Sequence, residues 1–218
     1  MIVVYSYLIR KIVCTLVLGI PLLQGDIALA YEEPGYEVVK TFPDFELRQY
    51  APYVVAETVV QGNFTDVGNL AFRRLFAYIS EEKRPQGEIA MTTPVIQQPL
   101  PKSSETGAEA VQEVGKSNRY RFAFVMPKSY TLESLPVPDN AEVTLKDVPA
   151  RLMAVRRYSG TWSEDRYRKN EQILFDAIKR KGLIIVGEPV FARYNAPFSL
   201  WFLRRNEVLI EIQERSYK

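Results

Sequence analysis

Apolar and polar residues alternate in short runs through the first half of the chain, and one longer stretch repeats its apolar residues at helical spacing. Residues 36–48 alternate on both sides of a Pro-Asp pair and predict a hairpin, and 53–60 predict a further strand. Between residue 60 and the extended run 89–98, apolar positions recur every three or four residues. We therefore expect a helix from 66 to 82, with Thr65 as its N-cap.

The second half of the chain shows the same order of elements. Residues 119–127 alternate and close the first half as a strand, and 142–160 predict two more strands. Residues 161–182 predict a helix, because Ser163 can cap its start, acidic residues follow, basic residues lie in its last turn and Gly182 can stop it. Later apolar runs predict the closing strands.

The two halves align with each other. Residues 62–64, Gly-Asn-Phe, fall on residues 160–162, Gly-Thr-Trp, and each triplet lies directly ahead of a predicted helix. The shared order is strands, a glycine-aromatic turn, a capped helix and a Pro-Val strand. We interpret this order as an internal duplication, with repeat halves at about 36–127 and 142–213, and expect an α+β fold whose two sheets join.

The N-terminus has the composition of an export signal. Arg10 and Lys11 supply positive charge ahead of the apolar segment 12–23, and small residues stand at Ala28 and Ala30. The apolar segment is shorter than the roughly 20 residues of a membrane span. We therefore predict a signal peptide that is cleaved after Ala30 and a periplasmic or secreted protein. An uncleaved membrane anchor is the alternative.

Two absences narrow the chemistry of the predicted mature chain, residues 31–218. The sequence has no histidine, and its single cysteine, Cys14, lies inside the predicted signal, residues 1–30. Imidazole catalysis, cysteine nucleophiles and zinc–cysteine sites are therefore excluded. The formal net charge of +2 argues against nucleic acid as a partner, because a phosphate backbone calls for a stronger basic surface. We expect no stable membrane insertion after cleavage.

Motifs of common enzyme classes are not found in this sequence. It has no glycine-rich phosphate loop and no nucleophile elbow. Its carboxylate pairs, Glu81-Glu82 and Glu164-Asp165, are adjacent on a helix or its cap. Successive helical side chains point about 100° apart, so such pairs are poorly placed to act as cooperating acid and base. We therefore predict that the protein is not an enzyme.

Three segments resemble the SOUL haem-binding protein family. They are "EIAMTTPV" at 88–95, "YSGTWSED" at 158–165 and "YNAPFSLWFLRRNEVLIEI" at 194–212. The resemblance covers residues 36–213. It implies a distorted antiparallel β-barrel of about eight strands flanked by two helices, built from two pseudo-symmetric βαββ repeats. It also implies non-covalent binding of haem or a related porphyrin, on which the fold does not depend, without established catalysis.

The resemblance further implies a ligand groove along the first helix and beneath the loop that precedes the Arg-Arg-Asn-Glu-Val ending. Carried to this chain, the apolar and polar positions of the groove are Asn69, Phe72, Phe76, Ala77, Tyr194, Pro197, Phe198 and Trp201. Candidate cations for the haem propionates are Arg73, Arg204 and Arg205, because a guanidinium can donate two bonds to one carboxylate. The proposed histidine ligand of some family members is missing, and no spacing singles out another iron ligand.

Several of these assignments have a purely structural alternative. Phe72 and Phe76 form either a wall for a macrocycle or a wider core face. Trp201 falls in a predicted strand, where core packing explains it equally well. The run 204–207 can be a turn whose side chains pair with each other. The Met-Thr-Thr-Pro-Val strand is best interpreted as architectural, because its proline suits a strand edge or kink.

The sequence as a whole predicts an exported tetrapyrrole-binding protein with an apolar groove and no histidine ligation. One alternative is a ligand-free interaction or structural module on the same barrel. Another is a small-molecule hydrolase, which would require a buried carboxylate that faces the groove. The oligomeric state stays open.

Overall fold

The computed structural model describes residues 31–81, 84–85, 87–100 and 118–213. The predicted signal peptide, residues 1–30, lies outside the described residues, and so does most of the polar segment that follows Leu100. Within the described part of the chain, no helix has the length and apolar character needed to cross a membrane.

The described part of the first half contains five strands and one long helix. They are β1 (Tyr36–Thr41), β2 (Glu46–Tyr50), β3 (Tyr53–Gln61), α2 (Val67–Ile79), β4 (Val95–Pro99) and β5 (Arg119–Val125). β1 and β2 form the predicted antiparallel hairpin around the Pro-Asp turn. The predicted strands over 53–60 and 119–127 are confirmed as β3 and β5.

The second half contains five strands, a second long helix and a short 3-10 helix. They are β6 (Val143–Val148), β7 (Arg151–Tyr158), α3 (Glu164–Arg180), β8 (Ile184–Ile185), β9 (Val190–Arg193), η1 (Trp201–Leu203) and β10 (Asn206–Gln213). The two strands predicted over 142–160 are present as β6 and β7.

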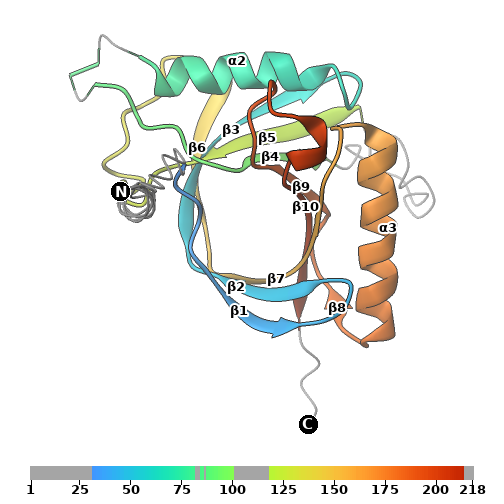
Figure 1. Cartoon of the computed structure of the whole chain (residues 1–218). Helices are drawn as coiled ribbons and strands as arrows, with labels where there is room; N and C mark the ends of the chain where they lie inside the picture. Colours follow the sequence, from blue (N-terminus) through green and yellow to red (C-terminus); the bar gives the residue numbers. More distant parts are fainter. Residues whose placement is uncertain (1–30, 82–83, 86, 101–117, 214–218) are drawn as a thin grey trace, which may run out of the picture. The chain divides into compact units, whose positions relative to one another are not determined.

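All ten strands belong to one curled antiparallel sheet with the order β1-β2-β7-β10-β9-β4-β5-β3-β6, and β8 pairs with β10 beside this path (Figure 1). The order is nearly symmetric about the central β4–β9 pair. Outward from it lie β5 and β10, then β3 and β7, then β6 and β2. The two halves exchange a strand: β2 of the first half pairs with β7 of the second half, and β6 of the second half pairs with β3 of the first. This exchange is what a duplicated unit produces when its two copies join into one sheet.

The structure confirms the α+β class and the two flanking helices, with two more strands than the eight expected. β1 and β6 end the strand order and do not pair with each other in the described sheet, so the barrel stays half open. α2 lies across β3 and β5, whereas α3 lies along β7 and β10 (Figure 1).

Helix α2 is shorter than predicted. It starts one residue late, with Asp66 rather than Thr65 as the N-cap, and it ends at Ile79 instead of residue 82. The buried residues on its sheet-facing side recur at helical spacing and are Val67, Ala71, Leu75, Tyr78 and Ile79. Ser80 ends the helix, with its backbone N–H and its hydroxyl both directed to the Phe76 carbonyl.

Helix α3 follows its prediction closely. Ser163 is the N-cap, Glu164 and Asp165 occupy the first turn, and basic residues lie in the last turn. Each charge faces the end of the helix dipole that it stabilises. Gly182 has φ +68, in the left-handed region that glycine adopts without strain, so it ends the helix as expected.

The main core fills the space between the two helices and the sheet. At its centre, the ring centroids of Phe64 and Tyr167 lie 5.3 Å apart, and that of Phe191 lies 5.2 Å from Tyr167. Phe64, from the first glycine-aromatic turn, is thus a core residue. Its counterpart Trp162 is only partly buried.

Two predictions about strands are wrong. Residues 89–94 form no strand apart from a single bridge between Thr92 and Glu32, and the consecutive residues Thr92, Thr93 and Pro94 are all buried, unlike the alternating faces of a half-exposed strand. Trp201 lies in η1 and is more than half exposed, so it packs into no strand core.

Candidate functional site

A groove with a volume of about 390 Å³ opens between the start of α2, the helix-facing side of the sheet and the loop that follows β9. Figure 1 shows the loop that carries η1 reaching up toward α2. The volume falls within the roughly 300–1,000 Å³ of typical ligand sites. The described lining residues are Tyr31, Thr65, Gly68, Asn69, Phe72, Met91, Thr92, Thr93, Val95, Phe122, Trp162, Arg193, Tyr194, Asn195, Ala196, Pro197 and Phe198.

Phe72 forms an apolar wall of the groove on the helix side. Its ring meets Phe124 of the sheet edge-on, with centroids 5.4 Å apart, and stacks on Phe76 one turn later at 5.6 Å. Phe76 itself does not line the groove and is 44% exposed. The ring of Phe72 is therefore held in place from two sides, and Phe76 supports it from outside.

A second aromatic wall of the groove is Trp162, which is fixed by a polar contact of its indole. Its indole Nε1 donates a hydrogen bond to Asn206 Oδ1 over 2.8 Å, and Asn206 Nδ2 donates to the Gly160 carbonyl over 3.1 Å. Because Trp162 is partly buried and its N–H is already bonded, its ring is held in one orientation.

Arg204 ties the loop after β9 to this wall. Its guanidinium lies 4.4 Å from the Trp162 ring centroid, and it donates hydrogen bonds to the carbonyls of Pro197 (2.6 Å) and Ser199 (3.0 Å). The loop thus carries Pro197 and Phe198 to the groove, where Phe198 remains 90% exposed. A large apolar ring that is almost fully exposed at the mouth of an apolar groove is suited to covering a ligand.

Arg193, the last residue of β9, stands on the floor of the groove. Its Nη2 donates a hydrogen bond to Gln97 Oε1, and its Nε is buried without a hydrogen-bond partner among the described residues. The guanidinium carbon lies 4.8 Å from the Phe191 ring centroid and 5.3 Å from that of Trp162. Burial lowers the pKa of Arg193 to about 10, so the side chain remains charged at neutral pH.

The Met-Thr-Thr-Pro-Val segment has both an architectural and a lining role. The Thr92 hydroxyl donates to the Val125 carbonyl, and the Thr93 backbone N–H donates to the Glu32 carbonyl over 2.9 Å, so the segment is fixed to two neighbours. Met91, Thr92 and Thr93 also line the groove. The sequence interpretation included only the first of these roles.

Behind the groove, Glu207 is fully buried at the centre of an ionic network. It accepts hydrogen bonds from Tyr194 (2.7 Å), Arg48 (3.1 Å) and Arg205 (3.0 Å). Arg205 also pairs with Glu33 over 2.8 Å. Burial, together with the charge of Glu207, raises the pKa of Tyr194 well above its ordinary range, so its phenol stays protonated.

The structure brings together five of the predicted site residues at the groove: Asn69, Phe72, Tyr194, Pro197 and Phe198. The others lie outside the described lining: Arg73, Phe76, Ala77, Trp201, Arg204 and Arg205. Arg73 and Ala77 are exposed on α2. Arg204 donates to the Pro197 carbonyl, and Arg205 donates to Glu207. The second contact agrees with the alternative that residues 204–207 pair with each other.

Sequence reasoning missed Trp162, Arg193, Gly68, Phe122 and the threonines of the central motif as lining residues. For Arg193 a signal was available. In "VFARY", Phe191 and Arg193 are two residues apart and share one face of a strand, so a buried Phe191 places Arg193 on the same covered face. A charged residue on a covered strand face marks a site that requires a charge.

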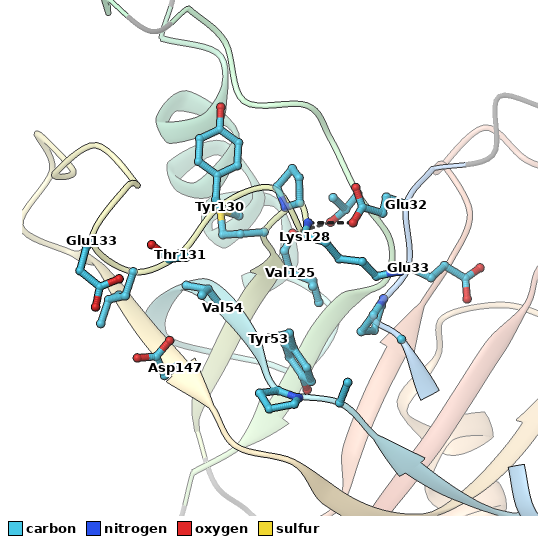
Figure 2. Close-up of a pocket in the computed structure, with 18 residues that line it drawn as sticks. Glu32, Glu33, Tyr53, Val54, Val125, Lys128, Tyr130, Thr131, Glu133 and Asp147 are labelled. Atoms are coloured by element: carbon cyan, nitrogen blue, oxygen red, sulfur yellow. Dashed lines mark hydrogen bonds between the residues drawn. The ribbon is translucent and has the colours of Figure 1, made fainter. Parts of the chain in front are cut away.

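A second cavity, of about 270 Å³, lies beside residues 32–35 and is shown in Figure 2. Its lining residues include Glu32, Glu33, Glu133, Asp147 and Lys128. Figure 2 shows Glu33 directed away from the cavity, where it pairs with Arg205. Acidic side chains disfavour an anionic ligand here. In the described residues, no cluster of three or more potential acidic or thiol ligands could hold a metal ion.

Comparison with solved structures shows a shared fold. The EcmrR C-terminal domain superposes with a TM-score of 0.54 at 11% identity, over 83% of this chain and 99% of that one. A protein described as a hydrolase from Listeria innocua gives 0.54 at 12% identity, over 80% and 94% of the two chains. EcmrR in its DNA complex gives 0.57 at 10% identity, over 78% of this chain and 57% of that longer chain. At these identities the likeness concerns the fold alone.

None of the curated proteins compared with this chain matches it. The sequence profile of the SOUL heme-binding protein family, by contrast, matches residues 31–211, which include both helices, the whole groove and the sheet except for the last two residues of β10. The chain therefore belongs to the SOUL haem-binding protein family.

Proposed function

We propose that the protein binds haem or a related tetrapyrrole, non-covalently, in the groove between α2 and the loop after β9. The observation that carries the proposal is that the groove is lined by two fixed aromatic walls, Phe72 and Trp162, and by a cation, Arg193, that has no ion pair among the described residues. A porphyrin is a flat apolar ring with carboxylates on one edge, and these groups match its two parts.

The residues of the groove fit such a ligand. Phe72, Trp162 and the exposed Phe198 can contact the faces of the ring, and Met91 and Val95 add apolar surface. Arg193 can meet a propionate, because a guanidinium donates two parallel hydrogen bonds to a carboxylate. Bound haem would supply its own redox or light-absorbing chemistry, whereas the protein holds, orients and shields it.

Iron ligation by histidine is excluded, because the sequence contains none. Tyr194 lines the groove, but its hydroxyl is bonded to Glu207 and stays protonated, so it is a poor source of a phenolate ligand. Retention then depends on apolar contact and on charge. We expect reversible binding in the micromolar range, since no strong iron–protein bond adds to these terms.

We further propose that the protein binds its ligand without transforming it. Among the described lining residues there is no carboxylate, lysine, serine or cysteine that could act as base or nucleophile. The buried carboxylate nearest in the fold, Glu207, has its oxygens engaged by Arg48, Tyr194 and Arg205. These observations disfavour the hydrolase alternative. We also retain as a proposal that the chain is exported by the signal predicted over residues 1–30.

Titration of the purified protein with haemin tests the proposed function. We expect a shifted Soret band and quenching of tryptophan fluorescence that saturate at one haemin per chain. Phe72→Ala should weaken binding about tenfold or more, because it removes a ring wall, and Phe76→Ala should weaken it much less, because that ring lies outside the groove. A haemin spectrum identical with and without protein would contradict the proposal.

An interaction module remains a second candidate, on one specific observation. The run 198–203 exposes five large apolar side chains by about half or more: Phe198, Leu200, Trp201, Phe202 and Leu203. Such a patch is unusual on a monomer and favours contact with a second surface. Sedimentation of the wild type and of Trp201→Ser with Leu203→Ser distinguishes this candidate, since loss of self-association in the variant would support it.

A further inference from the structure

The floor of the groove holds an arginine without the carboxylate that such a residue usually has. Arg48 and Arg205, which are also at least partly buried, each pair with Glu207 at 3.0–3.1 Å. Arg193 has no ion pair with any described carboxylate. A guanidinium that is partly withdrawn from water and unpaired costs free energy in the ligand-free protein, and this favours binding of an anion from outside.

The orientation of this guanidinium is fixed. Gln97 Oε1 accepts from its Nη2, and Gln97 is itself held because its Nε2 donates to the Phe64 carbonyl over 3.2 Å. The rings of Phe191, Trp162 and Phe122 lie 4.8, 5.3 and 5.8 Å from the guanidinium carbon. Cation–π contacts of this kind hold the charge without neutralising it, so Nη1 keeps its capacity to bind an anion, whereas the buried Nε is shielded from the groove.

The start of helix α2 adds a second positive potential at the same place. Thr65, just ahead of the helix, and Gly68 and Asn69 of its first turn line the groove, and the N-terminal end of a helix carries a partial positive charge. A Cβ on Gly68 would lie 3.4 Å from Arg193 Nη1, so the absence of a side chain there brings the guanidinium against the helix backbone. The N-cap carboxylate, Asp66, is exposed and bonded to Asn63 instead of Arg193.

We propose that the groove selects amphipathic ligands by their anionic group, which enters to the floor and binds between Arg193 and the first turn of α2 while the apolar body lies between Phe72 and Trp162. This inference deepens the proposed function and rests on the same groove. It assigns the ligand class as an apolar molecule with a carboxylate or a comparable anion. It also assigns the specificity to Arg193, with Gln97 as its positioning residue.

Two matched pairs of probes test the inference in the wild-type protein. The first is protoporphyrin IX against its dimethyl ester, which has the same ring without free carboxylates. The second is 1-anilinonaphthalene-8-sulfonate against N-phenyl-1-naphthylamine, which has the same body without the sulfonate. We expect each anion to bind at least about tenfold more tightly than its neutral partner, because a charge-assisted hydrogen bond contributes roughly that factor. Probe fluorescence reports binding directly.

Variants then assign the preference to one residue. Arg193→Met should lose most of the anion preference while neutral probes keep their affinity within about twofold, and Arg193→Lys should restore part of it. Arg73→Met, an exposed arginine of α2 outside the groove, is the matched control for net charge and should leave the preference unchanged. Circular dichroism of each variant checks folding, and the wild-type comparison stands even if one variant does not fold.

The outcomes separate this inference from the proposed function. If both porphyrins bind equally well and Arg193→Met changes nothing, the inference is overturned and tetrapyrrole binding stands. If neither porphyrin binds but the sulfonate probe is preferred through Arg193, the inference stands and the proposed function fails. Equal binding of both members in both pairs overturns the inference outright.

Discussion

Tyr194 donates its hydroxyl hydrogen to Glu207 over 2.7 Å. This contact joins the first residue after β9 to a carboxylate with no solvent exposure. The same carboxylate accepts from Arg48 and Arg205. Arg193 ends β9 and lines the groove, and Tyr194, which follows it and also lines the groove, directs its hydroxyl to the ionic network behind it. The network fixes the strand end on which the groove is built.

Removing the charge of Glu207 should strongly destabilise the fold. Glu207→Gln leaves the partly buried Arg48 without its buried partner, and breaking a buried ion pair in this way costs about 3–5 kcal/mol. The more exposed partner of Arg205 provides the control, because Glu33→Gln should cost no more than about 1 kcal/mol. Urea unfolding measures both. Equal losses for the two variants would show that burial of Glu207 is not what makes the network important.

Removing the unpaired charge of Arg193 should raise the free energy of unfolding, whereas removing that of Glu207 lowers it. Arg193→Met replaces a cation that burial disfavours by an apolar side chain of similar length, and we expect the ligand-free protein to gain about 1 kcal/mol of unfolding free energy at neutral pH. Arg73→Met should change it by less than about 0.5 kcal/mol. A loss of stability in Arg193→Met would mean that its contacts with Gln97 and the rings outweigh the cost of the charge.

The stability difference between the wild type and Arg193→Met should depend on pH, because it follows the pKa of Arg193. Because the folded-state pKa is lowered to about 10, the unfolded chain binds more protons than the folded chain above that pH. The stability of the wild type should therefore rise relative to Arg193→Met as the pH increases past 10. Affinity for an anionic ligand should be constant between about pH 7 and 9 and fall above 10, as the guanidinium loses its proton. Titrations of the sulfonate probe across this range, with wild type and Arg193→Met side by side, measure the effect.

The prediction of the fold from the sequence succeeded where one local pattern determines the outcome. The α3 helix has its cap, its charges and its terminal glycine in a single stretch, so its limits of 164 and 180 lie close to the predicted ones. The α2 helix ends early because Ser80 turns its N–H and hydroxyl back to Phe76, a competition that periodicity does not show. Residues 89–94 form no strand because Thr92 and Thr93 bond to separate, distant segments.

The candidate site was predictable only in part, because contacts between residues distant in the sequence also decide which side chains line it. Phe198 could be found because it lies in a segment that resembles the family, and Phe72 because the resemblance implies a groove along the first helix. Arg204 could not be assigned correctly, since its role depends on carbonyls five and seven residues earlier and on the ring of Trp162. Strand alternation could have placed Arg193 on a covered face, but nothing in its neighbourhood along the chain shows that Gly68 and Trp162 meet it in space.

Loosening the ligand loop should weaken binding without removing any lining residue. Arg204→Ala deletes the hydrogen bonds to the carbonyls of Pro197 and Ser199 and the contact with Trp162, so the loop is no longer held over the groove. We expect porphyrin affinity to fall about fivefold to tenfold, because ordering the loop then has to be offset by ligand binding. Arg204→Lys should behave almost like Arg204→Ala, since an ammonium cannot reach both carbonyls with the geometry of a guanidinium fork.

Replacing Gly68 by alanine should stabilise helix α2 but weaken the binding of an anion in the groove. Alanine is a better helix former than glycine by about 0.5–1 kcal/mol, and its Cβ would meet Phe122 at 3.9 Å without a clash, so Gly68→Ala should raise the melting temperature by a few degrees. The same methyl group would stand 3.4 Å from Arg193 Nη1 and narrow the anion's place between the guanidinium and the helix. Affinity for the sulfonate probe should therefore drop several-fold while that for the neutral probe changes little. A variant that is more stable and binds the anion as well as the wild type would place the anion elsewhere in the groove.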